Sequence, residues 1–198
     1  MTLELWNTFA TFGTFAVIAA TAIAALVQLR HARGSNQIAA LNELQDASQT
    51  PRFEAAQHVV QTELEGKLKD PEFRYQVSHR AARTIENRAF MASVNIVGNF
   101  YEHLGLLVKI GLLDSELALD FWSGTTPLLW ERLAPYTAIA RRVAGDQLWE
   151  NFEYLAVSAE DWVAAHPKGA YPAGTRRIGL KDEWLEVDRQ FEASRASA

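Results

Sequence analysis

The longest apolar stretch of the chain lies near its N-terminus. No charged side chain occurs between Glu4 and Arg30, which leaves 25 consecutive uncharged residues at positions 5–29. As an α-helix such a segment is about 37 Å long, and the hydrocarbon core of a bilayer is about 30 Å thick. The pattern therefore predicts a transmembrane helix. Large apolar side chains that favour its insertion are Phe9, Phe12, Phe15, Ile18, Ile23 and Leu26.

Two other interpretations of this segment are open. A cleaved signal peptide normally begins with positively charged residues, but the charged side chain that precedes the segment is Glu4. A soluble protein could instead bury its first helix against its own domain, although buried helices usually have apolar stretches shorter than about 18 residues. Both alternatives fit the sequence less well than a membrane span.

The charges beside the span predict its orientation. Arg30, His31 and Arg33 follow the span directly, and positively charged residues stay on the cytoplasmic side of a membrane. We therefore expect a single-pass protein of the cell (inner) membrane, with its N-terminus outside and its C-terminal domain in the cytoplasm. Residues 1–33 form the anchor and its basic flank in this interpretation.

Proline, glycine and capping residues divide the rest of the chain into helices. Thr50-Pro51 and Asp70-Pro71 each place a capping side chain before a first-turn proline, which predicts a helix start. We expect Gly34-Ser35 to interrupt the helix that leaves the membrane. We also expect Asp146 to cap the helix that ends near His166.

The predicted fold class is all-α, because no segment shows the alternation typical of a strand. An N-terminal transmembrane helix is followed by a cytoplasmic helical bundle over residues 34–167. Residues 168–198 contain several glycines and a proline and are predicted to form a loop and one short docking helix, which carries Trp184 and Phe191.

The segment from about residue 84 to residue 110 has the clearest helical pattern. Its apolar side chains fall on one side at 100° per residue, which predicts the central core helix of the bundle. Polar residues gather on the opposite side and form either a ligand-binding seam or an ordinary solvated face. The residues of this seam are Asn95, Asn99, Glu102 and His103.

Glu102 has a second interpretation. It forms either a partly buried ion pair with Arg141 or Arg142, which would join two helices, or a surface charge like its neighbours.

Charge and composition exclude several classes of function. The formal net charge of -5 gives no electrostatic reason to expect nucleic acid as a partner. From residue 34 onward there are 17 Lys and Arg against 23 Asp and Glu, so the acidic domain is segregated from the basic flank. The absence of cysteine excludes disulfides, thiolate metal sites and cysteine nucleophiles.

The sequence also lacks the common catalytic motifs. Its five histidines form no HExxH or Glu-x-x-His pattern, and neither a phosphate-binding glycine loop nor a GxSxG nucleophile elbow occurs. We therefore expect no cofactor, no metal site and no catalytic residues.

Three segments carry a resemblance to known proteins. They are YEHLGLLVKIGLLD at residues 101–114, WERLAPYTAIARR at residues 130–142 and WENFEYLA at residues 149–156. In this order behind an N-terminal span, the chain resembles a bacterial family of short membrane-anchored proteins described only as a domain of unknown function. The resemblance implies a single-span anchor and a cytoplasmic helical domain, and it implies no substrate or cofactor.

These observations favour an interaction module or accessory subunit of a membrane complex, without catalysis. The alternative is a membrane-anchored sensor that binds a small ligand at the polar seam. Expected partners are the lipid bilayer and either another protein or a second copy through the span. Ala16, Ala20 and Ala24 form a ridge that permits such self-association, unless their spacing simply reflects the alanine content of the span.

Overall fold

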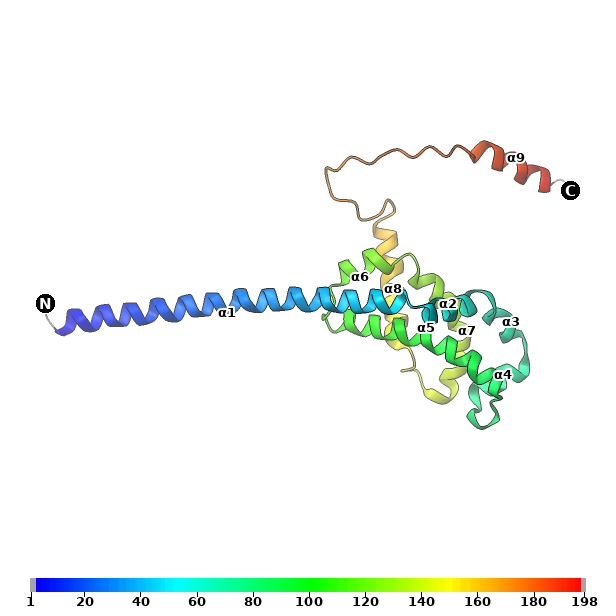
Figure 1. The fold of residues 1–198 in the computed structure, drawn as a ribbon, viewed down its shortest axis with the longest axis horizontal. Coiled ribbons are helices and arrows are strands. Elements are labelled where there is room, and N and C mark those ends of the chain that lie inside the picture. The colour runs from blue at the N-terminus through cyan, green and yellow to red at the C-terminus, as the bar shows by residue number, and fades with distance from the viewer. Residues whose placement is uncertain (1–2, 197–198) are drawn as a thin grey trace. The chain divides into compact units, whose positions relative to one another are not determined.

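The computed structural model describes the backbone of residues 3–196 and most of their side chains (Figure 1). The side chain of Phe9, one of the predicted span residues, lies outside the described residues. The described chain is helical and contains no strand, which confirms the all-α prediction. The helices are α1 (Leu3–Ser48), α2 (Pro51–Thr62), α3 (Leu64–Lys69), α4 (Pro71–Ser78), the 3₁₀ helix η1 (Arg80–Ala82), α5 (Ile85–Lys109), α6 (Ser115–Trp122), α7 (Thr126–Ala144), α8 (Glu150–Ala165) and α9 (Leu185–Ala196).

The chain divides into two compact units, Met1–Pro167 and Lys168–Ala198. The smaller unit consists of irregular backbone followed by α9, a short helix that contains Phe191 and begins directly after Trp184. Gly169 and Gly174 both have positive φ in its irregular part.

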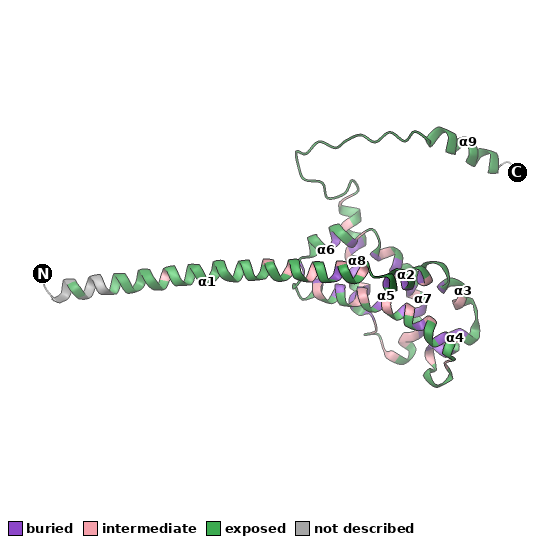
Figure 2. Ribbon diagram, in the orientation of Figure 1, coloured by how far each residue is buried: buried purple, intermediate pink, exposed green. Residues whose placement is uncertain are grey.

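Helix α1 runs without interruption from the apolar segment into the helical domain. The break expected at Gly34-Ser35 is wrong, because α1 continues through both residues to Ser48. Closer to its C-terminal end, one side of α1 is covered by the domain: Ala40 and Leu41 are partly buried, and Leu44 belongs to the core. The helix thus passes through a glycine and a serine of low helix propensity before it reaches the domain, since nothing lies within 4 Å of a Cβ placed on Gly34. Figure 2 shows the change from an exposed helix to one with buried positions.

Local capping explains where the next helices begin. The side chains of Thr50 and Asp70 accept hydrogen bonds from the N–H groups of Phe53 and Glu72, and a proline opens each helix. Both predicted helix starts are therefore confirmed. Asp114 caps α6 in the same way.

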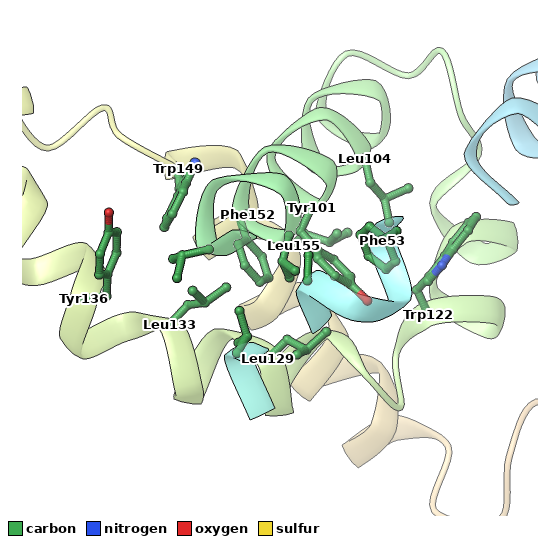
Figure 3. Packing of buried hydrophobic residues seen from close by; sticks show 14 of the residues in the cluster. Phe53, Tyr101, Leu104, Trp122, Leu129, Leu133, Tyr136, Trp149, Phe152 and Leu155 are labelled. Carbon is green, nitrogen blue, oxygen red and sulfur yellow. The ribbon is translucent and has the colours of Figure 1, made fainter. Parts of the chain in front are cut away.

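Helix α5 is the centre of the domain and packs against α2 on one side and α8 on another. Its inward side chains include Val94, Val97, Tyr101 and Leu104, all buried. Aromatic rings from the neighbouring helices close around them, as Figure 3 shows. The ring of Tyr101 stacks on Phe152 of α8 with the ring centroids 4.8 Å apart. The apolar stripe read from the sequence is thus the core side of α5.

A close approach of α5 to α8 requires a residue without a side chain. A Cβ atom placed on Gly105 would overlap the backbone carbonyl of Asn151, which belongs to the first turn of α8. Such an overlap cannot be relieved by a side-chain rotation, because the obstructing atoms are backbone.

We expect Gly105→Ala to lower the free energy of unfolding by about 1–3 kcal/mol, the usual cost of overpacking. Urea unfolding of the detergent-solubilised chain, followed by tryptophan fluorescence, measures this change. Gly66→Ala is the matched control, because nothing lies near a Cβ at that position within α3. The control should be stabilised by about 0.5–1 kcal/mol. Equal stability of the two variants would contradict the close approach.

Candidate functional site

The apolar part of α1 is exposed along its described length. Side chains that favour insertion are 62–70% exposed, namely Phe12, Phe15, Ile18, Ile23 and Leu26. Within the described residues, α1 is long and apolar enough to cross a membrane. None of its most apolar window is buried in the rest of the chain, whereas the first helix of a soluble protein would bury such a surface. The basic residues Arg30 and Arg33 follow within the same helix and are exposed.

The predicted polar seam on α5 is not one site. Asn95, Asn99 and His103 are exposed and line three different cavities, and Glu102 is half-buried and engaged by α8. The four side chains of the seam are thus not brought together around one cavity, because neighbouring helices divide this side of α5 among themselves. Two of the four side chains instead hold the start of α8.

Glu102 caps the N-terminus of α8 from another helix. Its Oε2 accepts hydrogen bonds from the backbone N–H groups of Asn151 and Phe152, at 3.0 and 2.9 Å. Its Oε1 accepts another from the side-chain amide of Asn151 at 2.7 Å. The N-cap residue of α8, Trp149, supplies no side-chain cap of its own. The carboxylate therefore satisfies N–H groups that a helix start leaves without partners, and its charge is favourable at that end of the helix.

Trp149 adopts a conformation that is unusual for a large side chain. Its φ is 55°, in the left-handed region, which costs roughly 1–2 kcal/mol for a residue other than glycine. The buried indole compensates: its Nε1–H donates to Oδ1 of Asn99 at 3.0 Å, and its ring stacks near Tyr136. Asn99 and Glu102 together thus fix where α8 begins.

The prediction that Glu102 forms an ion pair with Arg141 or Arg142 is wrong, because both Arg141 and Glu102 have other partners. Arg141 places Nη2 2.7 Å from Oε2 of Glu153 and donates from Nε to the carbonyl of Leu148. Arg142 is exposed. Backbone N–H groups at the start of α8 lie directly against Glu102 and take the place of the cation.

The start of α8 also corrects a second expectation. Asp146 does not cap this helix, since residues 146–149 form a turn and α8 begins at Glu150. Nothing in the local sequence identifies Glu102 as the cap, because 48 residues separate it from Glu150. The one available signal was the absence of Ser, Thr, Asp or Asn at position 149.

A small cavity of about 110 Å³ lies beside Asn95. It is bounded by Arg83 and by the buried Tyr136, with Ala140 and Leu148 among its apolar residues. Burial raises the pKa of the Tyr136 phenol above its ordinary value, and the positive charge of Arg83 opposes this rise. Arg83 already donates to the carbonyls of Gln76 and Val77, so its guanidinium holds the end of α4.

The described residues contain no group of three or more His, Asp or Glu side chains that could hold a metal ion. The functional interpretation therefore depends on two features: the exposed apolar part of α1 and the contact between α5 and α8.

We expect Glu102→Ala to lower the free energy of unfolding by about 3 kcal/mol or more, because each hydrogen bond to a charged group contributes roughly 1.5–3 kcal/mol. Glu102→Gln retains one acceptor oxygen and should fall between this variant and the unmodified chain. Urea unfolding followed by tryptophan fluorescence gives both values. Glu131→Ala is the control on an exposed site of α7 and should change stability by less than about 0.5 kcal/mol. Similar losses for Glu102→Ala and Glu131→Ala would show that the cap does not contribute.

Comparison with known proteins adds one finding. No curated protein and no solved structure matches the chain. A family described as Domain of unknown function (DUF4760) matches residues 15–162, a range that begins within the apolar part of α1 and ends within α8. The chain therefore belongs to the DUF4760 family.

Proposed function

We propose that the chain is a single-span membrane protein whose cytoplasmic helical domain acts as an interaction module or accessory subunit of a membrane complex. The observation that carries the proposal is the exposed apolar half of α1, which continues without a break into a half that packs on the domain. A helix can leave a folded domain with its apolar side chains uncovered only where lipid or another apolar surface covers them.

The flanking charges support the proposed orientation. Arg30 and Arg33 lie immediately after the apolar segment, and Glu4 lies before it. By the positive-inside rule this arrangement favours a helical domain in the cytoplasm and an N-terminus outside. The membrane of residence in this proposal is the cell (inner) membrane.

A role without catalysis is part of the proposal. Two of the α5 residues that were candidates for ligand binding, Asn99 and Glu102, instead hold the start of α8. The sequence contributes no common catalytic motif. Binding to another protein, or to a second copy through the alanine ridge, is then the activity that the fold serves.

We expect the full chain to remain with membranes after alkaline carbonate extraction. Two charges in the middle of the span, Phe15→Asp and Ile18→Asp together, should release it into the supernatant, since one central charge costs about 2.5–3.5 kcal/mol. Ile38→Asp is the matched control, because Ile38 is exposed on the same helix beyond the basic flank.

Retention of the doubly charged variant would contradict a span at this position. Orientation is read from single cysteines in this cysteine-free chain: a membrane-impermeant maleimide added to intact cells should label Trp6→Cys and leave Ile85→Cys unlabelled. The reverse pattern would contradict the proposed topology.

The interaction role predicts a stoichiometric partner. Affinity purification in a mild detergent should recover either a second protein in fixed ratio or a dimer of the chain. If the dimer forms through the alanine ridge, Ala20→Leu should abolish it and the exposed Ile38→Ala should not. Recovery of the chain alone, with no self-association, would contradict the proposal.

A further inference from the structure

The register of α1 against α5 locates the membrane-facing end of the domain. One cavity is lined by α1 residues from Ala40 to Ala47 and by α5 residues from Phe100 to Leu107. The next cavity is lined by Ala47 together with Ile96 and Phe100. Positions that increase along α1 therefore lie beside positions that decrease along α5, so the two helices are antiparallel.

This register brings the C-terminal end of α5 close to the span. Continuing the antiparallel pairing places the turn between α5 and α6 level with about residues 34–37 of α1. The last uncharged residue of the apolar segment, Leu29, is then only about 10 Å away along the helix. Figure 1 shows α6 and the adjacent end of α5 on the side of the domain from which α1 departs.

The turn itself exposes apolar side chains where turns are usually polar. Gly111 has φ 71°, and the N–H groups of Gly111 and Leu113 donate to the carbonyls of Val108 and Leu107. This arrangement buries Leu113 completely. On either side of Gly111, Ile110 is 56% exposed and Leu112 is 54% exposed.

One further apolar residue extends this surface. Leu106 lies one helical turn before Ile110, on the same face of α5, and is also exposed. We call Leu106, Ile110 and Leu112 the apolar turn. Lys109 lies beside it with its side chain about half exposed and its Nζ 3.0 Å from Oδ1 of Asn151.

We propose that the apolar turn inserts into the headgroup region of the leaflet that contains Arg30 and Arg33, as a second contact between the domain and the bilayer. The inference rests on the proposed membrane anchoring. Two observations favour lipid as the occupant. The continuous helix holds the turn about 10 Å beyond the end of the apolar segment, next to a headgroup layer that is about 5–8 Å thick on each side of the hydrocarbon core. Three side chains are also far fewer than the roughly 20–30 residues that each partner contributes to a stable protein interface.

The cysteine-free sequence permits a direct test in the full chain. Single cysteines replace Ile110, Leu112, Ile18 and Ile85, and each is labelled with an environment-sensitive fluorophore. The labelled chains are reconstituted into phosphatidylcholine vesicles with nitroxides near the headgroup or deep in the acyl chain. Neutral lipid avoids repulsion of the acidic domain. Ile85 is the matched control, because it is an exposed isoleucine (85%) at the opposite end of α5.

We expect Ile110→Cys and Leu112→Cys labels to emit at shorter wavelength than the Ile85→Cys label and to be quenched several-fold more by the shallow nitroxide. The Ile18→Cys label should be quenched most by the deep nitroxide. Quenching of Ile18→Cys without quenching at positions 110 and 112 would overturn this inference and leave the anchor intact. Blue-shifted but unquenched labels at 110 and 112 would show a protein occupant and overturn it too. An unquenched Ile18→Cys label would overturn the proposed anchoring and this inference together.

Discussion

The continuity of α1 is the constraint on which the rest of the structure depends. An α-helix satisfies its own backbone groups, so it is the form in which a single apolar segment can enter lipid. Here the same helix also contributes Leu44 to the core of the domain. Since no residue between the two halves breaks the helix, the position of the domain follows from the position of the apolar half. The proposed orientation from the basic flank and the proposed lipid contact of the apolar turn both depend on this continuity.

The domain itself is organised around the contact between α5 and α8. Gly105 allows the two backbones to approach, and Glu102 supplies a cap that the sequence before α8 does not provide. Trp149 is held in a left-handed conformation by Asn99 and by its buried ring. These polar contacts use side chains that, on a helix examined by itself, look like the lining of a binding site.

The parts of the fold that depend on neighbouring residues could be predicted from the sequence. Helix starts at Pro51 and Pro71 follow from the capping side chains directly before them, and the core side of α5 follows from its periodicity. The partner of Glu102 could not be predicted, because it depends on how two helices distant in sequence cross. The break expected at Gly34 is absent because one glycine costs only about 1 kcal/mol in a helix interior, and the residues on both sides of it continue α1. The sequence therefore indicates which side of α5 is polar, but it does not indicate which residues these polar side chains contact.

Because α1 is uninterrupted, the number of residues between its two halves also sets how the domain is rotated about the helix axis. Each residue of an α-helix turns the chain by 100° and advances it by about 1.5 Å. The face of α1 that packs on the domain begins at about Ala40, eleven residues after the last uncharged position of the apolar segment, Leu29. In the proposed membrane topology, this stretch sets the angle at which the domain faces its neighbours in the plane of the membrane. Among relatives of this chain, a gain or loss of one residue there would present a different side of the same bundle to a partner.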